Sequence, residues 1–314
     1  MEDLRIVFMG TPYFAVPSLQ ALIKNNYNIV AVVTAPDKPA GRGRKLHMSA
    51  VKIKALNNNL KVLQPTNLKS DEFLKSLINL KVNLQIVVAF RMLPKQIWQL
   101  PKYGTFNLHA SLLPNYRGAA PINWAIINGE KKTGVTTFFI DDKIDTGVII
   151  KQIETNINPD ENAGNLHDRL MILGSKLVLD TVKAIQNQNI ITKPQQNKLT
   201  YTAPKLNSDT CKINWQEDIL TIHNKVRGLS PYPAAWCFLK NDAKKIKLKL
   251  YKTTIENVAH NYKTGSLIYT KKTLKVACKN GWLYIKELQL AGKKKMEVQD
   301  FINGYIFTEG AILL

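Results

Sequence analysis

The alternation of short apolar runs with amphipathic stretches through the first 185 residues constrains the fold more than any other feature of the chain. Apolar residues recur at helical spacing in four stretches, which predicts helices at 15–24, 71–78, 119–128 and 165–185. Short apolar runs between them predict strands at 6–9, 29–33, 62–63, 84–89, 105–109 and 135–140. Because strands alternate with helices, we expect an α/β domain with a Rossmann-like, mostly parallel sheet covered by helices on both faces.

The composition changes after this first part. Residues 186–196 are polar, contain Pro194 and predict a linker. Basic and apolar residues then alternate over 245–251, as in a half-exposed strand, and Asn280-Gly281 signals a tight turn. Short strands in this region predict a small, OB-like β-barrel. A chain of 314 residues fits two domains, and we expect a first domain at 1–189, a linker at 190–206 and a basic β-barrel domain at 207–314.

The net charge of +21, from 44 Lys+Arg and 23 Asp+Glu, favours a polyanionic partner such as nucleic acid. Mutational drift toward lysine in an AT-rich genome is the alternative, but drift explains the low acidic count less well. Residues 205–314 alone hold 19 Lys+Arg and 9 Asp+Glu. A solvated face would explain the alternating lysines or the Lys293–Lys295 cluster taken singly. Together on a small barrel they predict a nucleic-acid-binding face that includes Lys247 and Lys249.

Several classes of protein do not fit the sequence. The three cysteines, Cys211, Cys237 and Cys278, are too widely spaced for a zinc site, and we expect buried thiols in a reducing cytosol. No apolar run approaches the roughly 18 residues of a membrane helix, and the N-terminus enters a strand without a signal segment. We therefore expect a cytoplasmic protein. The chain has no GxGxxG, phosphate-loop, HExxH or GxSxG motif, so neither a nicotinamide cofactor nor a metal is indicated.

Candidate chemistry is concentrated between Gly104 and Gly129. Asn107 and His109 are two residues apart on a predicted strand, so their side chains share one face near its carboxyl end, where ligands bind in open α/β sheets. An acidic loop that ends at Asp145 follows the strand at 135–140, again at a carboxyl end. A histidine of this kind is more often structural than catalytic, so the pattern alone leaves both interpretations open.

The run HASLLPNYRGAAPINWAIING, with its Asn-x-His, its Ser-Leu-Leu-Pro and the later loop that ends in Asp-Thr-Gly, resembles the signature of folate-dependent formyltransferases. Further segments are similar to the members of this family that act on methionyl initiator tRNA. These segments lie at 9–15, 35–46, 201–206, 213–215 and 226–233. The resemblance covers nearly the whole chain.

The resemblance implies an activity and a catalytic trio. The formyl group of 10-formyltetrahydrofolate, a co-substrate, would pass to the amino group of methionyl initiator tRNA, with no metal required. The catalytic residues would be Asn107, His109 and Asp145. The Asn107 amide or a protonated His109 could stabilise the developing oxyanion. Asp145 could accept a proton through a water or orient His109, so the residue that takes the proton stays open.

The resemblance also implies a folate cleft beside the catalytic strand. Its lining would comprise Phe90, Arg91, Met92, Leu93, Ser111, Leu112, Leu113, Pro114, Asp141 and Asp142. The chain departs from the family here, because Arg91 stands in place of an expected glycine and the segment is one residue short. Arg91 either turns outward or reshapes the pterin pocket.

For tRNA, the resemblance places the loop with Arg42, Arg44 and Lys45 at the acceptor end, with Arg42 critical, and the barrel at the acceptor stem. The alternative for the loop is a flexible, solvated, basic surface. Rival functions are a formyltransferase with a small amine acceptor, such as a glycinamide ribonucleotide or an amino sugar, a formylfolate hydrolase, or an RNA-binding homologue without catalysis. We expect a monomer.

Overall fold

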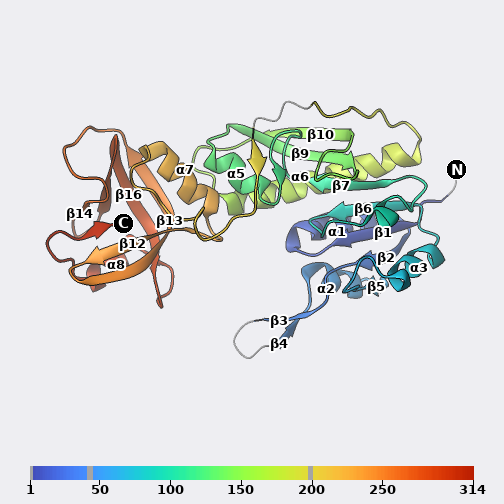
Figure 1. Ribbon diagram of the computed structural model, residues 1–314, viewed down its shortest axis with the longest axis horizontal. Helices are drawn as coiled ribbons and strands as arrows, with labels where there is room; N and C mark the ends of the chain where they lie inside the picture. Colours follow the sequence, from blue (N-terminus) through green and yellow to red (C-terminus); the bar gives the residue numbers. More distant parts are fainter. Residues whose placement is uncertain (1–2, 41–44, 197–200) are drawn as a thin grey trace. The chain divides into compact units, whose positions relative to one another are not determined.

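A computed structural model describes residues 3–40, 45–196 and 201–314 of the chain (Figure 1). The chain divides into two compact units. The first comprises Met1–Gly118, Thr133–Thr155 and His167–Thr202. The second comprises Ala119–Lys132, Asn156–Leu166 and Ala203–Leu314. The first contains a mostly parallel α/β sheet and the second an antiparallel barrel, so the predicted fold class is confirmed.

A seven-stranded sheet forms the first unit, in the order β10-β9-β7-β6-β1-β2-β5. Its strands are β1 (Ile6–Gly10), β2 (Ile29–Val33), β5 (Val62–Leu63), β6 (Leu84–Val88), β7 (Thr105–His109), β9 (Lys132–Phe139) and β10 (Ile149–Asn156). The pairs β1–β2, β1–β6, β2–β5 and β6–β7 are parallel. Every residue of β1 and β6 is buried, as parallel strands covered on both faces require.

Serine caps explain where two helices of the first unit begin. The Ser49 hydroxyl accepts a hydrogen bond from the Lys52 amide at 3.0 Å, and the Ser70 hydroxyl accepts one from the Phe73 amide at 3.3 Å. The predicted helix at 15–24 is a 3-10 turn followed by an α-helix. The helical elements are η1 (Tyr13–Ala15), α1 (Val16–Lys24), α2 (Ala50–Leu56), α3 (Asp71–Asn79), α4 (Lys95–Trp98) and the long α6 (Ala163–Gln186).

The direction of β9 corrects one expectation from the sequence. β9 runs antiparallel to β7, with Phe139 opposite Phe106 and Thr136 opposite His109. The end of β9 therefore lies beside the start of β7, and the acidic loop does not leave from the edge of the sheet at which His109 lies. The exposed strand β10, at the end of the sheet, was not predicted because its apolar residues do not form a continuous run.

The basic loop at 36–46 begins and ends as a β-hairpin. β3 (Lys38–Ala40) pairs antiparallel with β4 (Lys45–His47), with Pro39 opposite Leu46. Arg42 and Arg44 lie outside the described residues. Two further strands of two residues each are β8 (Arg117–Gly118) and β11 (Thr202–Ala203).

The second unit is built on an antiparallel sheet in the order β14-β15-β16-β13-β12-β18, with β17 paired to β16. An isolated bridge between Ser266 and Ile312 joins the two ends of this sheet, so the barrel is nearly closed. Apolar side chains such as Leu248, Leu250 and Leu283 fill its interior. The strands are β12 (Ala235–Asn241), β13 (Lys244–Glu256), β14 (Leu267–Tyr269), β15 (Leu274–Cys278), β16 (Gly281–Leu290), β17 (Met296–Glu297) and β18 (Ile312–Leu313).

Three helices complete this unit: α5 (Pro121–Ile127), α7 (Ile219–Leu229) and α8 (Val298–Gly304). A Cβ at Gly228 would lie 2.7 Å from Ile127 Cγ1, and Asn123 donates to the Gly228 carbonyl at 2.8 Å, so α5 and α7 pack closely here. The sequence did not predict α7, because the polar residues His223 and Arg227 are buried on it and interrupt the apolar periodicity.

A glycine in β9 tests the packing of the first unit. A Cβ at Gly134 would lie 2.2 Å from the Ile153 carbonyl oxygen and 2.6 Å from Leu112 Cδ2. We expect Gly134→Ala to lower the free energy of unfolding by about 1–3 kcal/mol, measured by urea denaturation, because backbone must move. The control is Gly304→Ala, where a Cβ meets nothing within 4 Å. Equal midpoints for both variants would contradict this packing.

The cysteines provide a second test. Burial raises the pKa of the Cys278 thiol to about 12 and raises that of Cys237 further, so both stay protonated and unreactive in the folded protein. We expect no rapid reaction of native protein with Ellman's reagent at pH 8 and reaction of three thiols per chain in urea. At pH values above the pKa of the thiols in the unfolded chain, the free energy of unfolding should fall with rising pH. The reason is that the thiols of the unfolded chain ionise at lower pH than those of the folded protein. Fast labelling of native Cys237 or Cys278 would contradict their burial.

Candidate active site

β7 carries two polar side chains on one face of the sheet. Its other face is covered by α6, where a Cβ at Gly174 would lie 2.7 Å from Leu108 Cδ2. Asn107 and His109 alternate with Leu108 and therefore point away from α6. His109 is buried, with 6% of its surface exposed. Asn107 is half-buried, and its amide makes no hydrogen bond with another described residue. That amide can therefore bind a ligand.

The acidic loop reaches His109 by running along β7. The Ile140 amide donates to the Thr105 carbonyl at 2.9 Å, beside the start of β7. Asp145 Oδ2 nevertheless lies 3.7 Å from His109 Nδ1, at the opposite end of that strand. Asp145 has a left-handed φ of 56°. A Cβ at Gly147 would lie 1.7 Å from the Phe139 carbonyl oxygen, so only glycine fits this turn.

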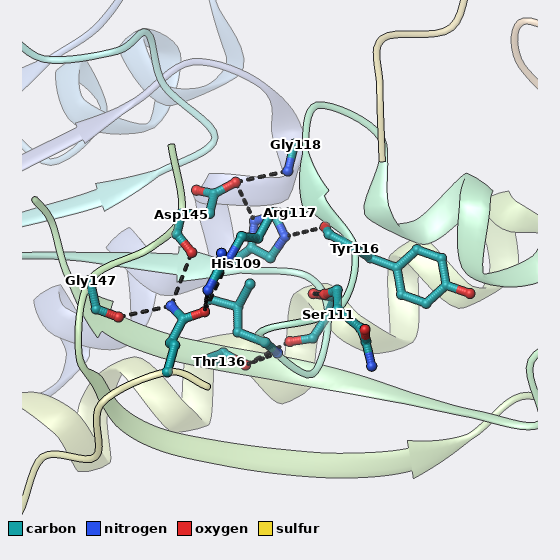
Figure 2. Close-up of polar contacts among 11 residues, drawn as sticks. His109, Ser111, Tyr116, Arg117, Gly118, Thr136, Asp145 and Gly147 are labelled. Atoms are coloured by element: carbon teal, nitrogen blue, oxygen red, sulfur yellow. Dashed lines mark hydrogen bonds and ion pairs between the residues drawn. The ribbon is translucent and has the colours of Figure 1, made fainter. Parts of the chain in front are cut away.

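Three consecutive residues connect the parts of the site (Figure 2). The Tyr116 carbonyl oxygen lies 2.8 Å from His109 Nε2. The Gly118 amide donates to Asp145 Oδ2 at 2.9 Å. Between them, the Arg117 guanidinium donates to Gln195 Oε1 from Nε at 3.0 Å and from Nη2 at 2.6 Å. Backbone groups therefore hold both candidate catalytic side chains.

The contact with Tyr116 assigns the protonation of the imidazole. A carbonyl oxygen only accepts hydrogen bonds, so His109 Nε2 carries the proton and donates it. When the ring is neutral, Nδ1 presents its lone pair toward Asp145. The separation of 3.7 Å between Nδ1 and Oδ2 is longer than a hydrogen bond. The His109–Asp145 pair can take up one proton.

The segment after β7 is fixed by its own hydrogen bonds. The Ser111 hydroxyl donates to the Asn115 carbonyl at 2.7 Å. The Thr136 hydroxyl donates to the Ser111 carbonyl at 2.6 Å and accepts from the Leu113 amide at 3.2 Å. The hydroxyl and the carbonyl of Ser111 and the amide of Leu113 are thus bonded within the protein. Of the four residues predicted to bind folate here, Leu112 and Pro114 are partly exposed.

The other two segments predicted to bind folate lie side by side. Lys95, at the start of α4, and Asp142 approach within 3.8 Å, and both are exposed. Phe90 and Ile140 pack against the same core cluster, which includes the buried Leu93. Met92 is 69% exposed, and it presents an apolar side chain in this region.

Arg91 takes the first of the two orientations considered from the sequence. Its guanidinium donates to the Pro65 carbonyl at 2.8 Å and to the Thr66 carbonyl at 3.2 Å, and it lies 5.3 Å from the centre of the Phe90 ring. The side chain is exposed. Arg91 therefore turns toward the segment after β5.

The base of the basic hairpin is anchored. The Asp37 carboxylate accepts hydrogen bonds from Lys52 Nζ at 2.5 Å and from Gln64 Nε2 at 2.9 Å. These two hydrogen bonds hold the pKa of Asp37 below its usual value, and the bond from Lys52 has the larger effect. Gln64 also donates to the Ala35 carbonyl at 2.8 Å. The chain that leads into β3 is thus tied to α2 and to the end of β5, and Lys45 is the first residue of β4.

On the barrel, lysines lie over aromatic rings. Lys247 Nζ is 3.8 Å from the centre of the Trp236 ring, and Lys245 Nζ is 4.4 Å from that of Phe238. Lys249 Nζ donates to the Pro233 carbonyl at 3.3 Å. We call these five residues of β12 and β13 the basic–aromatic face: Trp236, Phe238, Lys245, Lys247 and Lys249. Lys247 and Lys249 also border a hollow of about 270 Å³.

Sequence reasoning missed Tyr116, Gly118 and Gln195. The first two act through backbone groups, which leave no residue-type signal. Gln195 lies in a polar stretch that predicted a linker, and no motif distinguishes it. Among the residues with described positions, no helix is long and apolar enough to cross a membrane, and no cluster of three His, Cys, Asp or Glu side chains could hold a metal.

Two domain families match the chain. The formyl transferase family matches residues 4–182, and the C-terminal domain of formyl transferases matches residues 205–306. The methionyl-tRNA formyltransferase of Flavobacterium johnsoniae is 61% identical over 312 residues, with 99% of each chain covered. The methionyl-tRNA formyltransferase of Flavobacterium psychrophilum is 55% identical over 315 residues, with both chains fully covered.

Solved structures share the fold at low identity. WlaRD, a sugar 3N-formyl transferase solved in the presence of dTDP and 5-N-formyl-THF, matches with a TM-score of 0.66 and 23% identity. The match covers 94% of this chain and all of WlaRD. HypX from Aquifex aeolicus in complex with tetrahydrofolic acid matches with a TM-score of 0.65 and 16% identity, covering 96% of this chain and 47% of HypX.

Proposed function

The chain belongs to the methionyl-tRNA formyltransferases of the formyl transferase family, and from this premise we propose that it transfers the formyl group of 10-formyltetrahydrofolate to the amino group of methionyl initiator tRNA. The observation that carries the proposal is the approach of Asp145 to His109, within 3.7 Å, on the strand that also presents Asn107. These are the three residues to which the motif resemblance assigns catalysis.

The residues around this site fit a folate. The carrier, when bound, supplies an activated formyl carbon. Met92 and the half-buried Phe90 offer apolar surface to its rings, and Asp142 offers an exposed acceptor. Arg91 does not oppose this fit, because its guanidinium is bonded to Pro65 and Thr66. We propose that the segments 90–93, 111–114 and 141–142 hold the carrier.

Asn107 is the proposed oxyanion donor. Its amide has no partner among the described residues, and half-burial reduces competition from water. An N–H group aimed at the formyl oxygen stabilises the negative charge that develops as the amine attacks. Removal of one such donor costs about 2.7–4 kcal/mol of barrier in other enzymes.

The His109–Asp145 pair is the proposed proton acceptor. The attacking amine must be neutral, and it sheds a proton once the new bond forms. His109 Nε2 is engaged by the Tyr116 carbonyl, so Nδ1 is the ring nitrogen left to act. Asp145 Oδ2 accepts from Gly118, whereas Oδ1 has no hydrogen bond with a described residue and can receive the amine or a bridging water. Whichever atom takes the proton first, the pair then returns it to the folate nitrogen that carried the formyl group, and tetrahydrofolate leaves when the bond between that nitrogen and the formyl carbon breaks.

We propose that tRNA binds the basic–aromatic face and the basic residues Arg42, Arg44 and Lys45. On the face, a ring beneath the ammonium group of Lys247 or Lys245 limits its motion, so less conformational entropy is lost when it meets a phosphate. The same rings can contact an unpaired base. We further propose that the enzyme acts as a monomer, as suits an enzyme that binds the acceptor stem of a tRNA, in the cytoplasm where initiator tRNA is used.

The rival functions receive less support. The sugar N-formyltransferase WlaRD is 23% identical to this chain, so its likeness bears on the fold alone and not on the acceptor. A homologue without catalysis would not require the mutual arrangement of His109, Asp145 and Gly118.

Transfer of labelled formyl from 10-formyltetrahydrofolate to methionyl initiator tRNA tests the assignment. We expect Asn107→Ala to lower kcat by about 100- to 1000-fold, as loss of an oxyanion donor does. His109→Ala and Asp145→Asn should lower kcat by about 100-fold or more, since proton transfer contributes about 10²–10⁴-fold. The control Asp180→Asn, on the exposed side of α6, should leave kcat unchanged. A fully active Asp145→Asn enzyme would contradict the proton-acceptor role, and a native protein without transfer would contradict the function.

Salt dependence tests the basic–aromatic face. We expect tRNA binding to weaken steeply with salt, and Lys247→Ala to reduce the slope of log K against log salt by about one unit through loss of one phosphate contact. The control is Lys271→Ala, an exposed lysine between β14 and β15 that lies outside the face. If Lys271→Ala weakens tRNA binding as much as Lys247→Ala does, binding depends on the total charge of the protein and not on the basic–aromatic face.

A further inference from the structure

We propose that Gln195 is a positioning residue for Asp145, so that the stretch predicted as a linker forms part of the active site. The inference rests on the proposed function of Asp145. Gln195 belongs to the polar stretch that the sequence predicted as a linker. In the structure its half-buried side chain lies between the Asp145 turn and Arg117.

Both polar atoms of the Gln195 side-chain amide form two hydrogen bonds each. Nε2 donates to the Asp145 carbonyl at 2.9 Å and to the Gly147 carbonyl at 2.8 Å. Oε1 accepts two bonds from the Arg117 guanidinium, at 3.0 Å and 2.6 Å. Both donors and the acceptor are thus satisfied by two different segments, which fixes the orientation of the amide without ambiguity.

Backbone pairing delivers Gln195 to this place. Ile149, the first residue of β10, exchanges two hydrogen bonds of 2.8 Å with Lys193. Gln195 follows Lys193 by two residues. Further along, the Tyr201 carbonyl accepts from the Tyr116 amide at 2.9 Å, and the two rings stack at 5.6 Å between centres. The described parts of the segment therefore touch the site before and after Gln195.

The contacts of Gln195 act on the geometry of Asp145 in two ways. They hold the carbonyls of Asp145 and Gly147, which enclose the turn where Asp145 adopts its left-handed φ of 56°. They also hold Arg117, whose neighbour Gly118 donates to the Asp145 carboxylate. The Asp145 backbone is thus linked through Gln195 to Arg117, and the Asp145 carboxylate is bound by the neighbouring Gly118. A displacement of about 1 Å at such a residue can cost about 100-fold in rate.

A merely structural role is the alternative, and Gln195→Glu separates the two. A carboxylate at this position still accepts from Arg117, now as an ion pair, so the link to Arg117 is kept. It has no N–H to donate, and it repels the carbonyls of Asp145 and Gly147. The positioning role thus predicts that Gln195→Glu loses rate while it retains stability, whereas a structural role predicts that rate follows stability.

The experiment measures kcat and KM for formyl transfer to methionyl initiator tRNA, together with Tm, on the full-length protein. We expect Gln195→Ala and Gln195→Glu to lower kcat by about 10- to 100-fold, with KM for the tRNA changed less than about 2-fold. Gln196→Ala is the matched control, because that exposed side chain makes no hydrogen bond with a described residue. An active Gln195→Glu enzyme, or an effect confined to KM, would overturn the proposal.

A double-mutant cycle with Asp145→Asn completes the test. If Gln195 acts through Asp145, Gln195→Ala should lower kcat much less in the Asp145→Asn background than in the native one. Equal fold-changes in both backgrounds would overturn the positioning role. If the native enzyme transfers formyl and the Gln195 variants have the same kcat, this inference is refuted but the proposed function stands. Native enzyme without transfer refutes the proposed function instead.

Discussion

The backbone of Tyr116–Gly118 is the part on which the proposed active site depends. The Tyr116 carbonyl fixes the tautomer and orientation of His109, and the Gly118 amide binds the carboxylate of Asp145. Neither side chain is held by a neighbour on its own strand or loop. If this short segment moved, the imidazole would lose its hydrogen-bond acceptor and the carboxylate its donor. The distance between His109 and Asp145, on which the proposed proton transfer depends, would then change.

The loop that carries Asp145 follows an unusual path from the end of β9 to His109. Because β9 runs antiparallel to β7, the loop starts beside the first residues of β7 and must return along this strand to reach His109. The left-handed residue Asp145 and the crowded Gly147 allow the sharp turn that this route needs. Gln195 then ties the turn to Arg117. The proposed catalytic role needs the Asp145 carboxylate to be held from outside the loop, and a segment distant in sequence supplies that support.

The barrel follows more directly from its residue pattern. Basic and apolar residues alternate along β13, so Leu248 and Leu250 fill the interior while Lys245, Lys247 and Lys249 belong to the basic–aromatic face. The partner strand β12 places Trp236 and Phe238 within reach of these lysines. Electrostatic attraction of a polyanion is thus combined with aromatic surface, a combination that suits RNA better than charge alone.

Residue patterns predicted the strands and helices with strong periodicity, the α/β sheet followed by a barrel, and the candidate residues Asn107, His109 and Asp145. Periodicity and local motifs encode such features because they depend on neighbours in the chain. The tertiary structure alone decided the direction of β9, the outward turn of Arg91 and the roles of Tyr116, Gly118 and Gln195. These depend on hydrogen bonds between groups far apart in sequence, several of them backbone groups, whose partners are chosen by the folded chain and not by residue type.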